Sequence, residues 1–193
     1  MLNKTRIYSL TLFLFSFAST ARLDAAPIDT LAYLRLFLTQ SDLPGMKNDQ
    51  DSRKKGADSE DTSYRHYHGQ IAGMNIWNSK SGTDTIYRLV DIHWVFPDAE
   101  SAKSYLNQTW DYQSEGSKFL EGAPKVGEMS RVYGMSMNMG KFSMIALYYL
   151  FQEGRVVTKL FVTQGPELTK PVLFQKTQGL AEKLMEKIHK SGL

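Results

Sequence analysis

The stretch FSMIALYYLFQEGRVVTKLFVT, residues 142–163, decides the fold class. Its turn sequence Gln152-Glu153-Gly154-Arg155 separates two runs rich in β-branched and aromatic residues, and Gly154 supplies the positive φ that a hairpin turn needs. One face of this predicted hairpin carries Ile145, Leu147, Tyr149, Phe151, Val156, Leu160 and Val162, and the other carries Met144, Ala146, Tyr148, Leu150, Val157 and Phe161. Neither face is polar, whereas a sheet with one wet face alternates apolar and polar residues. We therefore expect helices to cover both faces.

Further strands are predicted before this hairpin. Residues 64–79 read as one bent strand or a hairpin, residues 85–96 as a β-branched strand, and residues 129–137 as a strand that turns through residues 138–141 into the opening stretch. The polar residues 47–63 and residues 113–124 are predicted to be loops.

Three segments have the apolar spacing of amphipathic helices. The first is residues 29–39, capped by Asp29, with the apolar stripe Leu31, Leu34 and Leu38. The second begins at Pro97-Asp98 and runs to about Trp110. The third is residues 171–190, with the apolar stripe Leu173, Leu180, Leu184 and Ile188. The predicted fold class is therefore α+β, an antiparallel β-sheet covered by helices on both faces, without internal repeats.

Several short motifs resemble segments of exported bacterial families of unknown function. They are Asp42-Leu43-Pro44-Gly45 after a short helix, the strand-to-helix junction at residues 96–102, Val126-Gly127-Glu128, and the residue 152–157 hairpin ahead of a terminal helix. The order of elements over nearly all of the mature chain is similar to the PsbP/Mog1-like sandwich. This resemblance implies that fold and an exported, often non-catalytic role, and it assigns no functional residue.

The N-terminus has the pattern of a secretory signal peptide. Lys4 and Arg6 precede the uncharged apolar run 7–18, and Ser19-Thr20-Ala21 offers a small-x-small cleavage site. We expect a signal peptide over residues 1–21, with cleavage as late as residue 26 as the alternative, followed by a single α+β domain over residues 27–193. The other interpretation is a membrane anchor, but the apolar run is shorter than the roughly 20 residues that span a bilayer.

The amino-acid composition excludes several classes of function. Of 23 Lys and Arg residues, Lys4 and Arg6 leave with the leader, so 21 basic residues face 20 acidic ones and the mature net charge is near +1. That balance excludes an electrostatic nucleic-acid binder. The chain has no cysteine, which excludes a lipidated lipobox, disulfides and thiolate chemistry. We expect an exported protein, periplasmic or extracellular.

Methionines gather in Met135-Ser136-Met137-Asn138-Met139 and at Met144. If the turn centres on Met139-Gly140, Met135 faces Met144 and Met137 faces Phe142, which brings the thioethers of Met135, Met137 and Met144 onto one patch. Soft sulfur ligands select Cu(I) or Ag(I). The alternative is that these methionines fill an irregular interface between sheet and helix.

A second candidate site combines imidazoles with a carboxylate. His66 and His68 have the i, i+2 spacing that places both rings on one strand face, and Asp91 and His93 repeat that spacing on the next predicted strand. If the strands are neighbours, these four residues form a site for Zn or Cu. The alternative is that the imidazoles lie at a wet sheet edge and that Asp91, which interrupts an otherwise apolar strand, accepts a structural hydrogen bond from His93 or Arg88.

Catalytic motifs fail on inspection. Residues 134–138 resemble a nucleophile elbow but lack its final glycine, and the chain has no Walker, dinucleotide-binding or H-E-x-x-H pattern. The sequence therefore predicts a non-enzymatic, exported binding or accessory module with an unknown protein or small-molecule ligand, held in a shallow apolar cleft near Met135, Met137 and Met144. The alternative function is a periplasmic metal-binding protein that uses the methionines or the histidines.

Overall fold

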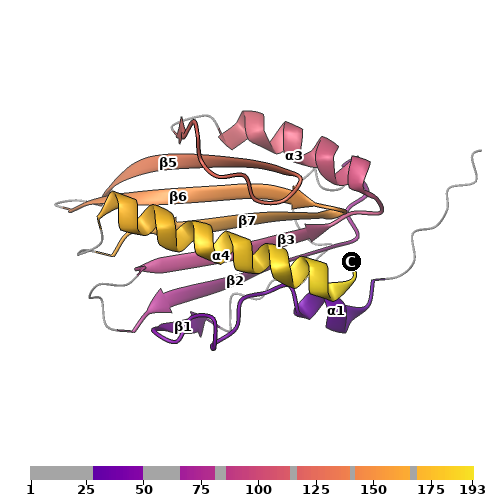
Figure 1. Ribbon diagram of the computed structural model, residues 1–193, viewed down its shortest axis with the longest axis horizontal. Coiled ribbons are helices and arrows are strands. Elements are labelled where there is room, and N and C mark those ends of the chain that lie inside the picture. The colour runs from indigo at the N-terminus through magenta and orange to yellow at the C-terminus, as the bar shows by residue number, and fades with distance from the viewer. Residues whose placement is uncertain (1–27, 50–65, 81–85, 114–116, 140–141, 166–168) are drawn as a thin grey trace, which may run out of the picture.

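The computed structural model describes residues 28–49, 66–80, 86–113, 117–139, 142–165 and 169–193. Seven antiparallel strands form one sheet in the order β1-β2-β3-β7-β6-β5-β4 (Figure 1). The strands are β1 (Met46–Asp49), β2 (Ile71–Ser79), β3 (Arg88–Val95), β4 (Lys118–Phe119), β5 (Met129–Met139), β6 (Phe142–Glu153) and β7 (Val156–Thr163). The helices are α1 (Thr30–Leu34), α3 (Ala99–Gln113) and α4 (Lys170–Ser191).

The opening hairpin lies at the centre of this sheet. Gly154 has φ +52° at the turn between β6 and β7, as the turn sequence predicts. β7 then pairs along its whole length with β3, from Arg88 opposite Thr163 to Val95 opposite Val156. This β3–β7 pairing joins the strands that precede α3 to the strands that follow it.

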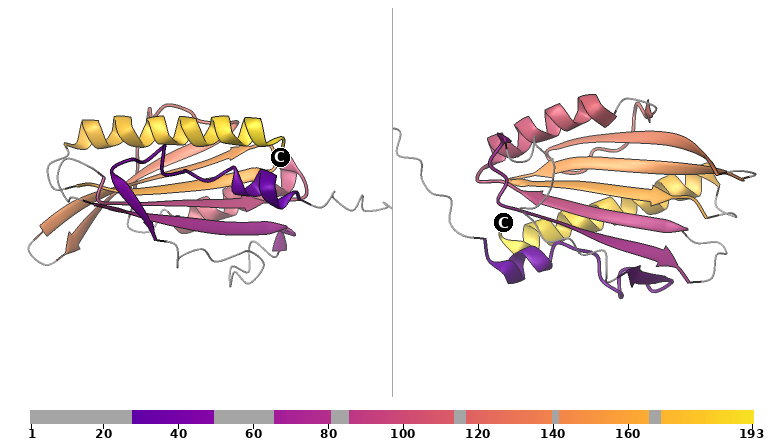
Figure 2. Two further views of the ribbon diagram at one scale, coloured as in Figure 1. Left: turned by 90° about the horizontal axis from the view of Figure 1, so that it is seen from below. Right: turned by 180° about the vertical axis from the view of Figure 1, so that it is seen from behind.

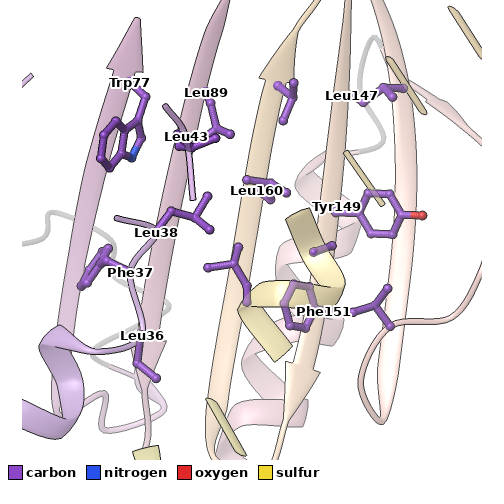
Figure 3. Packing of buried hydrophobic residues seen from close by; sticks show 14 of the residues in the cluster. Leu36, Phe37, Leu38, Leu43, Trp77, Leu89, Leu147, Tyr149, Phe151 and Leu160 are labelled. Carbon is purple, nitrogen blue, oxygen red and sulfur yellow. The ribbon is translucent and has the colours of Figure 1, made fainter. Parts of the chain in front are cut away.

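The face of the sheet under α4, here called the α4 face, holds the main hydrophobic core. α4 crosses the strands diagonally (Figures 1 and 2) and buries Leu173, Leu184 and Ile188 against the sheet. The irregular segment after α1 covers the part of this face nearer β2 and β3, where its Leu36, Phe37, Leu38 and Leu43 meet residues such as Trp77, Leu89 and Leu160 (Figure 3). Helix and irregular chain thus share the cover of one face.

The opposite face, here called the α3 face, carries a smaller core. α3 begins after Asp98, whose carboxylate accepts a hydrogen bond of 2.7 Å from the Ser101 backbone N–H. Its buried residues pack on one end of the strands, in a cluster of Ala72, Trp94, Phe96, Ala102, Tyr105, Leu106, Leu150 and Val157. Figure 2 shows the strands of this face running well beyond α3.

The predicted PsbP/Mog1-like sandwich, with helices over both faces, is therefore wrong. The fold is dominated by a seven-stranded antiparallel sheet with one long C-terminal helix, and α3 covers only one end of its own face. The first predicted helix is a single five-residue turn, and Leu31 and Leu34 are 64% and 46% exposed instead of buried. An apolar face does not require a complete helical layer, because an irregular segment such as residues 36–43 covers part of the α4 face as well.

Other boundaries also differ from the prediction. β1 and β4 lie in segments expected to be loops, where short pairings to a neighbouring strand override polar composition. Residues 66–70 precede β2 instead of extending it. In the β5–β6 hairpin, Met137 faces Met144 and Met139 faces Phe142, so the turn lies one residue later than expected. The predicted leader, residues 50–63 of the predicted loop and the turn residue Gly140 lie outside the described residues.

Candidate functional site

Asp91 and His93 lie on the α4 face of β3, below the segment that follows α1. Both are fully buried. One carboxylate oxygen of Asp91 accepts a hydrogen bond of 2.9 Å from the Leu38 backbone N–H and lies 3.8 Å from His93 Nε2. His93 Nδ1 is 2.9 Å from the Thr158 hydroxyl on β7, and Phe37 packs edge-on against the imidazole ring. This buried network fastens the irregular segment to the centre of the sheet.

The order hydroxyl, imidazole, carboxylate in Thr158, His93 and Asp91 resembles that of a hydrolytic triad. A nucleophile must reach its substrate, however, and all three residues have 0% exposure. The second carboxylate oxygen of Asp91 and His93 Nε2 have no hydrogen-bond partner among the described residues, and both are enclosed by the core. The network is therefore structural, which is the alternative interpretation given above for Asp91.

The structure does not bring the four predicted metal ligands together. His66 and His68 are exposed and precede β2; His66 is helical and His68 lies in a turn, so neither is on a strand. His68 has φ +58°, and the ring of His66 packs edge-on against Tyr67. Among the described residues, no three histidine or carboxylate side chains are grouped so that they could hold a metal ion.

The three candidate methionines lie on the α3 face. Met137 is directly opposite Met144, and Met135 is opposite Ala146, one step further along the same face. The predicted pairing of Met135 with Met144 is thus wrong by one register step, but the shared face is confirmed. Met135 is half-buried, and its sulfur accepts a hydrogen bond of 3.6 Å from the Tyr148 hydroxyl. The side chain of Met137 lies outside the described part of the structure.

Beside these methionines lies a group of half-buried side chains, Met135, Tyr148, Lys159 and Phe161, here called the aromatic–lysine cluster. Its residues lie on β5, β6 and β7. The rings of Tyr148 and Phe161 are opposite each other across the strands, with centroids 4.6 Å apart. The Lys159 ammonium lies 5.1 Å from the centroid of the Tyr148 ring, within the range of a cation–π contact.

Burial controls the protonation of this cluster. It lowers the pKa of Lys159 below its ordinary value, because a low dielectric disfavours the ammonium form. The same effect raises the pKa of Tyr148, since the tyrosinate would be the charged form. Burial therefore disfavours the charged forms of both side chains.

Lys159 lies at the border of the part of the sheet that α3 packs against. Its neighbours across the strands are Leu150, which belongs to the α3 core, and Ile92. The next row along the sheet holds Val90, Phe161 and Tyr148, and the row after that holds Arg88, Thr163 and Ala146. The cluster therefore borders the α3 core, and its half-buried side chains lie next to Val90, Ala146 and Thr163, which are buried.

Sequence analysis placed a cleft near the methionines but did not identify Lys159 or the pairing of Tyr148 with Phe161. The signal was present, since Lys159 is the single charged residue in the apolar run 156–163. A lysine that interrupts a buried strand is rare, because burying an ammonium is costly unless the charge is compensated.

Comparisons with known proteins add information on the fold. No protein-family model and no curated protein matches the chain. The extracellular domain of PknH from Mycobacterium tuberculosis is similar in structure, with a TM-score of 0.55 and 12% identity over 86% of this chain and 99% of that domain. A protein from Bacteroides thetaiotaomicron VPI-5482 is less similar, with a TM-score of 0.37 and 8% identity over 64% of this chain and 39% of that one. The first likeness concerns the fold alone.

None of the helices in the described part of the chain combines the length and the apolar character needed to cross a membrane.

Proposed function

We propose that the chain is an exported, non-catalytic binding module that holds its ligand on the part of the α3 face beyond α3. The observation that carries the proposal is the aromatic–lysine cluster: the rings of Tyr148 and Phe161 lie 4.6 Å apart with a tilt of 36°, and the Lys159 ammonium lies over the Tyr148 ring. Binding sites typically combine such apolar and aromatic surface with a small number of polar groups.

Three observations support export. The first residues have the charge and apolar pattern of a signal peptide, the chain lacks cysteine, and the fold is similar to that of a domain described as extracellular. In the proposal the mature protein is periplasmic or extracellular.

The absence of catalysis is proposed from the chemistry of the buried groups. The hydroxyl, imidazole and carboxylate of Thr158, His93 and Asp91 are sealed under the core, where substrate has no access. On the α3 face, the described positions of β2, β3, β5, β6 and β7 carry no carboxylate or imidazole that could exchange protons with a ligand near neutral pH.

The test uses the full chain, expressed with its own leader in a Gram-negative host. Recovery in the periplasmic fraction, with an intact mass that places cleavage between residues 21 and 26, is expected for an exported protein. Native mass spectrometry without chelator should then show a co-purified small molecule or partner. Retention of the full-length mass in the cytoplasm would contradict export, and a wild-type protein free of any bound species would contradict the binding role.

A matched pair of variants locates the site. Phe161→Ser removes one ring of the stacked pair, whereas Phe119→Ser removes an aromatic ring that is 51% exposed at the sheet edge. We expect the co-purified species to be lost from the first variant and kept by the second. Equal retention by both variants would move the site away from the aromatic–lysine cluster.

A second candidate function, soft-metal binding, is favoured by the register of β5 and β6. That register places Met135, Met137 and Met144 on one face, with Met137 directly opposite Met144. Thioethers on adjacent strands are suitable ligands for Cu(I) or Ag(I). We expect Cu(I) to bind under reducing conditions and to be lost when Met135 and Met137 are both replaced by Leu. Equal copper retention in the double variant would remove this candidate.

A further inference from the structure

We propose that the ligand of this module is an anionic amphiphile, a molecule with a carboxylate or phosphate head beside Lys159 and an apolar chain lying over Phe161, Tyr148 and Met135. This inference rests on the proposed function and adds to it the chemical class of the ligand. It is carried by the charges of the α3 face and by the order of side chains along it.

The α3 face of the five central strands carries charge of one sign. The pairing of β2, β3, β5, β6 and β7 places three charged residues on this face, Arg88, Arg131 and Lys159. The carboxylates of the same strands, Asp91 and Glu153, lie on the α4 face. Among the charged side chains of these five strands, those on the α3 side are therefore all cations, and positive charge favours an anion.

The apolar part of the ligand is inferred from the rows beyond Lys159. Phe161 and Tyr148 occupy the first row, Ala146 and Thr163 the second, and Met144 the row beyond Ala146 on β6. Met135 borders the second row from β5. Phe161, Tyr148, Met135 and Met144 are all half-buried, so their side chains form a mixed aromatic and thioether surface instead of projecting into water. Methionine adapts to irregular apolar shapes, and such a surface suits a flexible chain.

Lys159 is positioned to distinguish a charged head from a neutral one. Its stem lies between Leu150 and Ile92, and its ammonium reaches over the Tyr148 ring. An anion beside the ammonium would form a charge-assisted hydrogen bond, in a setting that is buried enough to lower the pKa of Lys159. The head is thus assigned to the end of the surface nearest α3.

The experiment measures the affinity of the purified mature protein by isothermal titration calorimetry for four probes: decanoate, decyl phosphate, decanol and inorganic phosphate. We expect both anionic amphiphiles to bind, decanol to bind at least about tenfold more weakly, and inorganic phosphate not to bind. Tenfold corresponds to the lower range for one hydrogen bond to a charged group.

The variants separate charge from apolar contact. Lys159→Met keeps an unbranched side chain and should weaken decanoate about tenfold or more without changing decanol, while Lys159→Arg should restore most of the affinity. Lys118→Met is the matched control, because Lys118 is exposed on β4 and its pairing with Gly134 places it on the α4 face, away from the proposed site. Its affinity for decanoate should remain that of the wild type, and the circular dichroism spectra of all variants should superimpose.

Each outcome distinguishes the two proposals. If decanol binds as tightly as decanoate and Lys159→Met changes nothing, the anionic class is refuted, and loss of decanol binding in Phe161→Ser would still support the binding face. If inorganic phosphate binds as tightly as decyl phosphate, the ligand is a free anion and the apolar chain is refuted. If no probe binds, this inference fails, and the co-purification experiment alone decides the proposed function.

Discussion

Replacing Asp91 with alanine removes the acceptor that fastens the segment after α1 to the sheet. In the wild type, one Asp91 oxygen accepts the Leu38 backbone N–H at 2.9 Å, and the carboxylate lies 3.8 Å from His93 Nε2. Leu38 is 2% exposed, so water cannot take over as the acceptor without opening the core. The variant therefore leaves a buried donor without a partner.

The magnitude follows from these two losses. A hydrogen bond to a charged group contributes about 1.5–3 kcal/mol, and a buried donor left unsatisfied costs about 1–3 kcal/mol. The terms overlap, and together they place Asp91→Ala at roughly 3–5 kcal/mol, as for other buried polar pairs that lose one partner. That is a large share of the about 5–15 kcal/mol by which a domain is stable. Asp91→Asn keeps an oxygen acceptor and should cost only about 1–2 kcal/mol.

Urea unfolding followed by tryptophan fluorescence measures these free energies, and amide hydrogen exchange at Leu38 reports on the contact itself. Asp98→Ala is the matched control, because it removes a carboxylate that caps α3 at the exposed surface and should cost about 1 kcal/mol. The reasoning is refuted if Asp91→Ala lowers the free energy of unfolding no more than Asp98→Ala does. It is also refuted if the Leu38 amide exchanges at the same rate in these two variants.

Three further predictions concern other buried contacts. Gly127→Ala should lower the free energy of unfolding in urea by about 2 kcal/mol or more, because φ is +72° and a Cβ would lie 2.6 Å from the Gln152 carbonyl oxygen. Gly122→Ala is the control: its φ is +76°, the space around it is open, and it should cost only about 1 kcal/mol. Equal losses in the two variants would contradict the steric explanation. Burial, together with the charge of Glu182, raises the pKa of Tyr149 to about 12, so the free energy of unfolding should fall as the pH rises from 10 toward 12. Tyr149→Phe should abolish this alkaline loss of stability. A Tyr149→Phe variant with the alkaline profile of the wild type would disprove the prediction. Burial alone would raise the pKa of Asp42, but hydrogen bonds from Thr39, Lys187 and Lys183 outweigh it and hold the pKa well below 3.8. The free energy of unfolding should therefore decrease as the pH falls below 3.8. Urea titrations over a range of pH should show a smaller decrease for Asp42→Asn than for the wild type.

Features set by a few adjacent residues could be predicted from the sequence. The turn at Gly154 and the caps at Asp29 and Asp98 are local, and the structure confirms each of them, with Asp29 accepting the Leu31 backbone N–H at 2.9 Å. Glu186 and Lys190 pair at 3.5 Å, as their i, i+4 spacing predicts. Such contacts depend on the sequence within one turn and not on which other elements are nearby.

The first helix shows where this reasoning fails. Leu31, Leu34 and Leu38 have helical spacing, yet the helix ends at Leu34 and the chain then buries Leu36, Phe37 and Leu38 consecutively. Three adjacent residues cannot share one face of a helix, so the segment gains more burial by unwinding across the sheet. Periodicity identifies apolar residues, but it does not tell which surface lies near enough to cover them.

The candidate site was predicted only in outline. The shared face of Met135, Met137 and Met144 follows from the two-residue period of a strand, and it survives a register error of one turn residue because the true turn preserves that parity. The contact of Lys159 with Tyr148 depends on the pairing of β6 with β7 and on the limited reach of α3. The enclosure of His93 depends on Phe37, which lies 56 positions earlier in the chain, and no local pattern reveals it.

The pairing of β3 with β7 has a kinetic consequence. Residues 88–95 must meet residues 156–163, whereas only two residues connect β6 to β7, and only two connect β5 to β6. The β5–β6–β7 meander can form early, because its loop-closure entropy is small, but the halves of the sheet join only across the sixty residues that separate β3 from β7. The merging of two preformed sub-sheets is thus the expected rate-limiting step of folding, and until it occurs the long edge of β7 is open to pairing with other chains.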